Sequence, residues 1–317
     1  MANDRLINPF DIDNKDYFWL KGNLHSHTTN SDGLPPPQER LNGYINQGYD
    51  FLCISDHYKI TRIDTLNAPD DFVLVQGAEL HPENPFGGQT HHFLAYNIHD
   101  DIDSKNLSPQ QVIDEVKQQN GSIWLAHPHW SAVNILRDTI PLQGLSGVEV
   151  FNTTCRCMGR GESSVHWDDW MDLIGRPIPA LANDDSHALE SDHRDTYQAW
   201  NMVKVKERSA EAIINALENG CGYVTNGPEI QDIQLRRVND LNNKDTCIEA
   251  TILCSEAQNI FAIDNLHGME YRSKDGKTFE KAILTLRPNL RWVRFEIIGP
   301  DGKKAWSNPI DLLSLEK

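Results

Sequence analysis

The chain has 317 residues, of which 39% are hydrophobic and 24% are charged. At about 150 residues per domain, this length predicts two units or one barrel with an appendage. The composition excludes a disordered chain, and no apolar stretch approaches the ~20 residues of a bilayer-spanning helix, so we expect no membrane insertion. With 46 acidic and 29 basic residues, the formal net charge is −17. This charge would repel a nucleic-acid backbone and excludes general nucleic-acid binding.

The N-terminal segment and the cysteines bear on cellular location. Residues 1–5 lack the basic and apolar parts of a secretory signal, so we expect a cytoplasmic protein. The six cysteines are scattered without a disulfide framework, which is typical of reduced thiols. One Cys155-x-Cys157 pair could bind a soft metal, but we interpret it as two ordinary thiols.

Short apolar runs of β type alternate with helical stretches from about residue 19 to residue 224. The runs cover residues 18–25, 51–55, 72–77, 93–98, 122–126, 147–151, 178–182 and 200–205. Helices are predicted over residues 37–47, 108–119 and 209–218, the second with Ser108 as N-cap and Pro109 in its first turn. This alternation is typical of α/β proteins, and seven or eight βα repeats favour a closed barrel over an open sheet.

The pattern changes after residue 228. Alternating runs at residues 247–254, 260–263, 282–286 and 292–298 are separated by Asp-Gly turns, with no convincing helix. We therefore predict two domains, an α/β domain over residues 1–228 and a small all-β, sandwich-like domain over residues 229–317.

Six polar motifs end successive apolar runs of the first domain. In the first, His25-Ser26-His27, the two imidazoles project to one face of a strand and could hold one cation. In Asp185-Ser186-His187, the first and third side chains likewise project to one strand face. The others are Ser55-Asp56-His57, Gly77-Ala78-Glu79, His91-His92 and Ala126-His127-Pro128. Any one histidine is more often a core residue, but six motifs at successive strand ends predict one shared metal site.

As an ordered set, these motifs resemble those of the polymerase-and-histidinol-phosphatase (PHP) family of metal-dependent phosphoesterases. The resemblance covers about residues 20–228. It implies a distorted (β/α)7 barrel, similar to a TIM barrel, whose carboxyl-terminal rim holds two or three divalent ions, usually Zn, Mn or Fe. Imidazole and carboxylate ligands suit such ions, and no cysteine falls at a ligand position.

The resemblance also implies three ligand sets. The first ion would take His25, His27, Glu79 and Asp185; Glu79 would bridge to a second ion on His92 and His127; and the third would use Asp32, His57 and His187. Two positions leave alternatives. His91 could replace His92, and Asp184 could replace Asp185, although only Asp185 shares a strand face with His187.

The predicted chemistry is hydrolysis of a small anionic phosphoester, such as a nucleotide, sugar or histidinol-type phosphate mono- or diester. The nucleophile would be a metal-bridging hydroxide held by Glu79, because adjacent cations lower the pKa of a bridging water. His129 is a candidate proton donor, and Arg156 and Arg194 are candidate phosphate contacts. Glu149 is expected to orient a histidine of the site. Three ions would make the pocket electropositive despite the net charge.

Several assignments stay open. The same hydroxide could attack a carboxyl ester, a carbamate or an amide, and a non-catalytic metal-binding accessory module is a further alternative. Tryptophans such as Trp130 could stack on a substrate ring, but tryptophan is more often a core residue. Four further histidines, His81, His129, His166 and His193, lie near the motifs.

Overall fold

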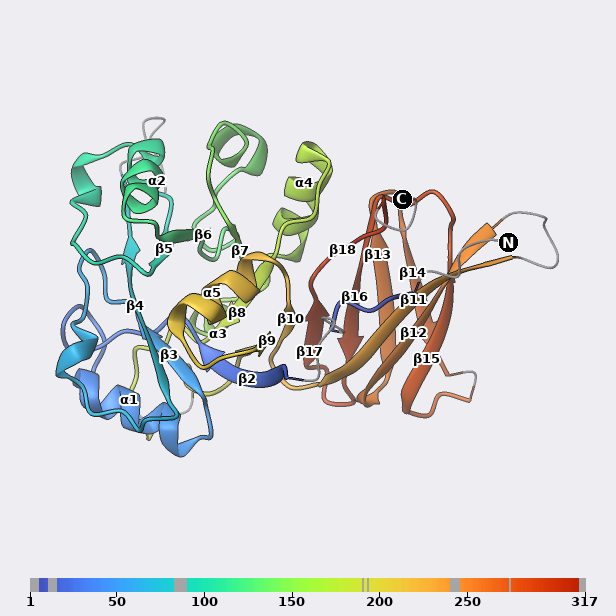
Figure 1. Cartoon of the computed structure of the whole chain (residues 1–317), viewed down its shortest axis with the longest axis horizontal. Helices are drawn as coiled ribbons and strands as arrows, with labels where there is room; N and C mark the ends of the chain where they lie inside the picture. The colour runs from blue at the N-terminus through green and yellow to red at the C-terminus, as the bar shows by residue number, and fades with distance from the viewer. Residues whose placement is uncertain are drawn as a thin grey trace.

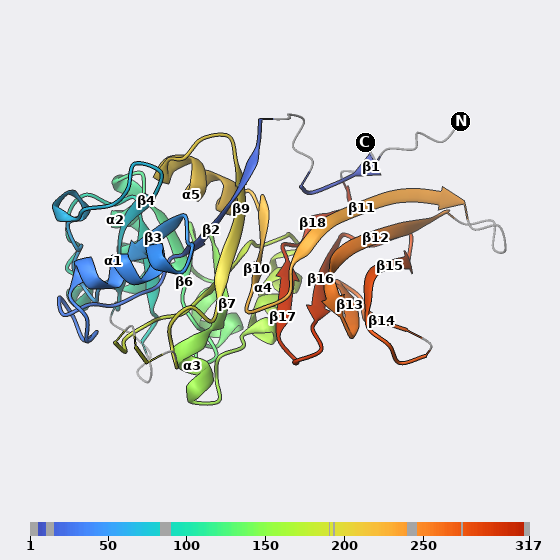
Figure 2. The same ribbon diagram turned by 90° about the horizontal axis from the view of Figure 1, so that it is seen from below.

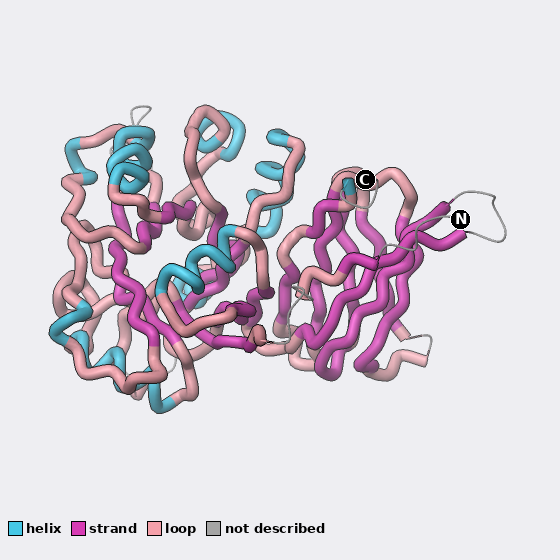
Figure 3. The backbone as a smooth tube through the Cα atoms, in the orientation of Figure 1, coloured by secondary structure: helices cyan, strands magenta, loops and turns pink. Residues whose placement is uncertain are grey.

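The computed structural model describes residues 6–10, 16–82, 90–189, 191–192, 194–239, 246–273 and 275–313. Figure 1 shows two parts side by side, an α/β part that contains most of the earlier residues and a β part that contains the later ones together with the N-terminal strand. Figure 3 shows that the helices gather in the first part, whereas strands dominate the second.

The first part has nine strands and five α-helices within the described residues. The strands are β2 (Phe18–Asn23), β3 (Phe51–Ile54), β4 (Val73–Leu80), β5 (Phe93–Tyr96), β6 (Ser122–Leu125), β7 (Gly147–Asn152), β8 (Ala180–Asn183), β9 (Trp200–Val205) and β10 (Gly222–Thr225). The helices are α1 (Pro37–Asn46), α2 (Pro109–Gln118), α3 (Thr153–Cys157), α4 (Ser164–Ile174) and α5 (Ala210–Glu218). Short turns form η1 (Ile63–Thr65), η2 (Ser104–Asn106) and the π-helical η3 (Ile135–Thr139).

The predicted runs and the three predicted helices are all present, with bounds shifted by a few residues. Ser108 caps α2 as predicted, because its side chain accepts a hydrogen bond from the backbone N–H of Gln111. The α/β class is confirmed, whereas the predicted distorted (β/α)7 barrel stays a prediction. Strand β5 is antiparallel to both of its neighbours, and only the 3₁₀ turn η1 lies between β3 and β4.

The strand order is β10-β9-β2-β3-β4-β5-β6-β7-β8, and its two ends approach each other. A parallel bridge joins Ser26, just beyond β2, to Ser186, just beyond β8. The Asn201 side chain on β9 also bonds both the backbone N–H and the carbonyl of Ala182 on β8. The sheet therefore curls so that the carboxyl ends of β2 and β8 meet.

The second part is a two-sheet β structure. Its strands are β11 (Ile230–Asn239), β12 (Thr246–Ala257), β13 (Asn259–Asp264), β14 (Gly268–Arg272), β15 (Phe279–Leu286), β16 (Trp292–Ile298), β17 (Lys304–Ser307) and β18 (Ile310–Asp311). One sheet has the order β1-β11-β12-β15, where β1 is the N-terminal strand (Leu6–Ile7). The other contains β14-β13-β16-β17, with β18 beside β16, and a core of buried aliphatic side chains lies between the two sheets.

The two parts are joined by continuous pairing. Strand β17 pairs with β10, so the sheet of the first part runs on into the second, and Figure 2 shows β9, β10 and β17 side by side between them. The N-terminal β1 pairs with β11 rather than with its sequence neighbours. The predicted division at residue 228 stays a prediction. No helix in the described ranges is both long and apolar enough to cross a bilayer.

Candidate metal centre

The curled sheet brings all six motifs to one end. His25 and His27 follow β2, His57 follows β3, and Glu79 lies near the end of β4. His92 precedes β5 instead of following it. Because β5 is antiparallel, its beginning lies beside the carboxyl ends of β4 and β6, so the motif still arrives at the shared edge.

Glu79 is at the middle of the cluster, and its carboxylate is 1% exposed. Its Oε2 lies 3.2 Å from His25 Nε2, 3.3 Å from His27 Nε2 and 3.0 Å from His57 Nδ1. Its Oε1 lies 2.7 Å from His92 Nδ1 and 3.2 Å from His127 Nε2. Each carboxylate oxygen thus faces its own set of imidazoles, which is the arrangement that a bridging carboxylate needs.

The first predicted set comes together as one group. The ligand atoms of His25, His27, Glu79 and Asp185 all lie within 4.8 Å of one another. Asp185 Oδ1 is 3.1 Å from His25 Nε2 and 2.9 Å from His27 Nε2. Asp184, the alternative, points elsewhere and accepts hydrogen bonds from the Tyr44 hydroxyl and from three backbone N–H groups.

The second set, Glu79 with His92 and His127, also forms one group of nearby ligand atoms. His91, the alternative to His92, lies away from Glu79. Its ring stacks on Phe93 with a centroid separation of 5.3 Å, and neither ring nitrogen makes a hydrogen bond. The geometry therefore favours His92.

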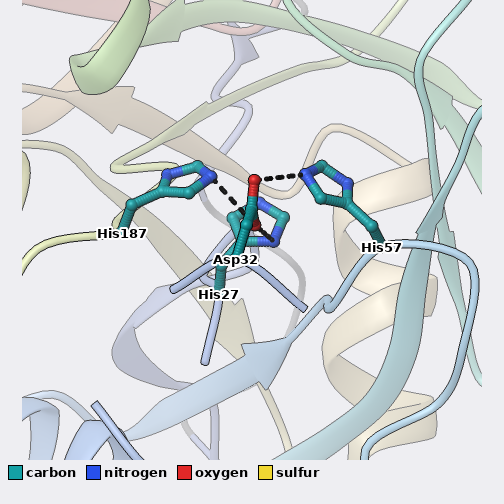
Figure 4. A group of neighbouring side chains, drawn as sticks. All are labelled: His27, Asp32, His57 and His187. Carbon is teal, nitrogen blue, oxygen red and sulfur yellow. Dashed lines mark ion pairs between the residues drawn. The ribbon is translucent and has the colours of Figure 1, made fainter. Parts of the chain in front are cut away.

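The third set lies at the mouth of the site and gathers Asp32, His57 and His187 with His27 (Figure 4). Asp32 Oδ2 is 3.4 Å from His57 Nε2, and its Oδ1 is 3.4 Å from His187 Nε2. The loop that carries Asp32 packs closely against the backbone of His27. A Cβ on Gly33 would lie 2.4 Å from the His27 carbonyl group, so this approach requires glycine.

The structure adds one residue to which sequence reasoning gave no role. His81 forms a group with His57 and Glu79, and its Nε2 is 3.4 Å from Glu79 Oε1. Its Nδ1 lies 2.9 Å from the Tyr58 hydroxyl, which fixes the ring. The signal in the sequence was its position two residues after Glu79, which places both side chains on one face of β4's end.

Glu149 stands behind the ligands, as predicted for a residue that orients a histidine. It is fully buried, and its Oε1 is 3.0 Å from His25 Nδ1. It also accepts hydrogen bonds from the His127 backbone N–H and from the side chains of Asn152 and Asn183. This network holds the His25 ring with Nε2 toward the cluster.

Opposite charges at the site shift several pKa values. Burial lowers the pKa of His57, but Glu79 and Asp32 outweigh it and raise the pKa to about 10. For His187, Asp32 and Asp185 likewise outweigh burial and raise the pKa to about 9. Hydrogen bonds to His187 and His57 hold the pKa of Asp32 well below its ordinary value. Protons thus balance the carboxylates when no cation is bound, and metal binding would release them.

The donor set fits a divalent cation. Besides the two ring nitrogens of His91, one ring nitrogen in each of four cluster residues is buried without a hydrogen bond: His25 Nε2, His27 Nδ1, His57 Nδ1 and His81 Nε2. We call these the four unpaired ring nitrogens. Buried polar atoms are normally satisfied, and imidazole nitrogens beside carboxylates are the ligands that Zn, Mn and Fe accept.

Backbone strain marks the same region. Tyr58, His127 and Asp185 adopt left-handed backbone conformations, with φ of 67°, 23° and 55°. Such conformations are unfavourable for residues other than glycine and cluster at functional sites, where the surrounding structure enforces them.

A cavity of about 230 Å³ opens above the cluster. Its lining includes Asp32, His57, Glu79, His92, His127, Asp185 and His187, together with Trp130, Thr154, Cys155 and Met158. The structure thus brings every predicted metal ligand to this cavity or directly beneath it.

The predicted proton donor and phosphate contacts are not brought together with these ligands. The Nδ1 of His129 lies 2.9 Å from the Glu162 carbonyl, and its ring stacks on His166, so the structure gives no support for a proton donor there. Arg194 is exposed and pairs with Asp192. Arg156 is exposed on α3 and does not line the cavity. His193 lies outside the described residues.

Part of the sequence is similar to a known protein. No family model matches the sequence. An uncharacterized protein of Methanocaldococcus jannaschii is 28% identical over 145 residues, which cover 42% of this chain and 82% of that protein.

Solved structures resemble the chain more completely. A two-domain protein of Bacteroides vulgatus, described as containing a predicted PHP-like metal-dependent phosphoesterase, aligns with a TM-score of 0.52 at 15% identity. The alignment covers 93% of this chain and 96% of that protein. A metal-dependent phosphoesterase-like protein of Bifidobacterium adolescentis (15% identity, 53% of this chain and 88% of that one) has a TM-score of 0.41, too low to establish a shared fold. The chain therefore shares the overall fold of the Bacteroides vulgatus protein, whose description names the family that the motifs resemble.

Proposed function

We propose that this chain is a metal-dependent hydrolase of a small phosphoester. The observation that carries the proposal is the Glu79 carboxylate, whose two oxygens face two separate sets of buried imidazoles. Such a carboxylate is suited to joining two adjacent cations. The Bacteroides vulgatus protein, which is described as containing a predicted metal-dependent phosphoesterase, supports the same class of activity.

The proposed ligands are the three groups described above. His25, His27, Glu79 and Asp185 would hold one ion; Glu79, His92 and His127, with His81 nearby, a second; and Asp32, His57 and His187 a third. When bound, two or three ions of Zn, Mn or Fe would supply Lewis-acid charge for the phosphoryl oxygens and lower the pKa of water toward ~7.

The chain's own residues would prepare this chemistry. Glu149 holds His25 through its Nδ1, and Asn152 Nδ2 donates both to Glu149 and to Asp185 Oδ2, at 2.9 and 3.1 Å. These bonds fix the ligands before any ion arrives, which reduces reorganisation during the reaction. Burial of His25, His27 and Glu79 keeps bulk water from their side chains.

We also propose that residues 1–228 form the catalytic domain, with β2–β8 as a distorted barrel, and that residues 229–317 are an appended β domain. The bridge between Ser26 and Ser186 supports the closed arrangement. The N-terminal strand β1 contributes to the second unit through its pairing with β11.

The test combines metal analysis with substrate screening. Protein purified without chelator is expected to contain Zn, Mn or Fe and to hydrolyse p-nitrophenyl phosphate. Faster turnover of p-nitrophenyl acetate would favour a carboxyl-ester hydrolase instead. Bound metal without turnover of any ester or amide would indicate an accessory module.

A further inference from the structure

The cavity above the metal centre has two chemically different sides. One side consists of imidazoles and carboxylates, which would hold cations and thereby an anionic group. The other consists of Trp130, Thr154, Cys155 and Met158. At about 230 Å³, the cavity is smaller than the ~300–1,000 Å³ of typical small-molecule sites.

Trp130 forms the part of this wall nearest the second ligand set. Its ring lies edge-on to His92 and His127, with centroid separations of 5.4 and 5.2 Å. Its backbone N–H donates to the His127 carbonyl at 2.9 Å, which fixes the indole relative to the ligands. An aromatic face so placed favours contact with an apolar group of the substrate.

Helix α3 forms the rest of the wall. The Thr154 hydroxyl is engaged, because it donates to the Asp185 carbonyl at 2.6 Å. Cys155 is buried, and Met158 lies at the end of the helix with about half of its surface exposed. None of these side chains carries a positive charge.

No lysine or arginine lines the cavity in the part of the chain that the structure describes. Arg194 is paired with Asp192 outside it. Arg156 belongs to α3, but its side chain is exposed and is not part of the cavity lining. A second phosphate beside Trp130 and Met158 would therefore have no cationic side chain of the cavity lining as its partner.

We propose that the substrate is a phosphomonoester with one anionic group and a small apolar alcohol, aromatic or branched. The phosphate would lie on the metal side, and the alcohol would contact Trp130, Cys155 and Met158. This inference rests on the proposed phosphoesterase function and narrows it, since nucleotides with several phosphates and sugar phosphates would fit this wall poorly.

The experiment compares kcat/KM for four compounds with the metal-loaded protein. These are phenyl phosphate, benzyl phosphate, glycerol 3-phosphate and adenosine 3′,5′-bisphosphate. We expect the two aromatic esters to be preferred by about 10-fold or more, the scale at which apolar pockets discriminate. Equal or greater activity on either polar compound would overturn the inference while leaving the phosphoesterase proposal intact. Hydrolysis of none of the four would contradict the phosphoesterase proposal itself.

Substitutions of Met158 and Trp130 test whether the apolar wall causes the substrate selectivity. Met158→Arg is expected to lower kcat/KM for phenyl phosphate and to raise it for the bisphosphate, because the new charge lies at the cavity mouth. Leu173→Arg, a half-exposed position on α4 away from the cavity, is the matched control and should change neither value. Trp130→Ala should raise KM for the aromatic esters, and Trp130→Phe should restore most of the loss. Unchanged selectivity in both Met158→Arg and Trp130→Ala would contradict the proposal.

Discussion

A buried charge in the β part and the buried imidazoles of the metal centre differ in how their polar atoms are satisfied. In the β part, Arg294 on β16 is fully buried, and its guanidinium donates to Asp168 at 2.8 and 2.7 Å and to Glu296 at 2.7 Å. Its guanidinium also lies 4.6 Å from the ring centroid of Trp167. In the α/β part, the four unpaired ring nitrogens are equally buried but lack hydrogen bonds. A structural charge is satisfied within the protein, whereas the metal centre keeps its ligand atoms available.

The two parts also differ in how often residues other than glycine adopt a positive φ. Every described residue other than glycine with a positive φ lies before residue 198, in the α/β part. In the described residues of the β part, only glycines have a positive φ, such as Gly276 and Gly302 at turns. Strain and unsatisfied polar atoms thus occur together in the part that we propose is catalytic.

Two adjacent aspartates give the largest expected effects. Asp185→Asn removes a charged ligand atom and should lower kcat by at least about 100-fold with little change in folded structure. Asp184→Asn should instead keep the metal and lose about 1–3 kcal/mol of unfolding free energy, because in either orientation its amide NH2 group would face at least one of the backbone N–H groups that the carboxylate accepts. Metal content, kcat and urea unfolding of both variants make the comparison, and metal loss in Asp184→Asn would reverse our assignment.

Removing the buried charge of Arg294 tests how much its ion pairs stabilise the protein. Arg294→Met leaves Asp168 and Glu296 without their cation and should destabilise the protein by about 3–5 kcal/mol. Metal content per folded chain should not change, because β16 lies outside the centre. Denaturant unfolding and metal analysis measure these effects, and a variant as stable as the parent would show that the buried ion pairs of Arg294 do not contribute to stability.

The residues behind the ligands should have smaller effects. Glu149→Gln weakens the bond that orients His25 and is expected to lower metal affinity by about 10–100-fold. Competition with a chelating dye measures this change in the purified protein. Unaltered affinity would mean that Asn152 and Asn183 suffice to position the site.

His81 provides a further test of the centre. His81→Ala should weaken binding of one ion by about 10-fold, at the lower end of the range for residues that support a metal site. Tyr58→Phe should do the same to a lesser extent. His166→Ala, a histidine outside the ligand groups, is the control, and equal affinities in His81→Ala and the parent would exclude His81 from the centre.

The smallest expected effect concerns Arg156. Because its side chain is exposed and lies outside the cavity lining, Arg156→Ala should change kcat/KM by less than about 2-fold. A large rise in KM for phosphoesters would revive the phosphate contact predicted from the sequence.

The sequence predicted the site best where metal-ligand side chains follow directly after apolar strands. Alternation along a strand places His25 with His27 on one face, and the end of each apolar run marks the edge where ligands gather. The antiparallel direction of β5 and the pairing of β1 with β11 depend on long-range contacts, and no local pattern records them.

The sequence also did not predict which way individual side chains point. Arg156 and His129 occur in suitable positions along the chain, but neither lines the cavity, and the His129 ring lies against the Glu162 carbonyl. The apolar wall could not be read from the sequence either, because Trp130 and Met158 meet only through the fold.

Metal stoichiometry of the intact protein tests the central claim most directly. Protein purified without chelator, or reconstituted with Mn or Zn, is expected to bind two or three ions per chain by elemental analysis. Glu79→Gln should lose ions from both of the sets that share this carboxylate. A chain that binds no divalent ion, or that keeps full hydrolytic activity after exhaustive treatment with EDTA, would contradict the account.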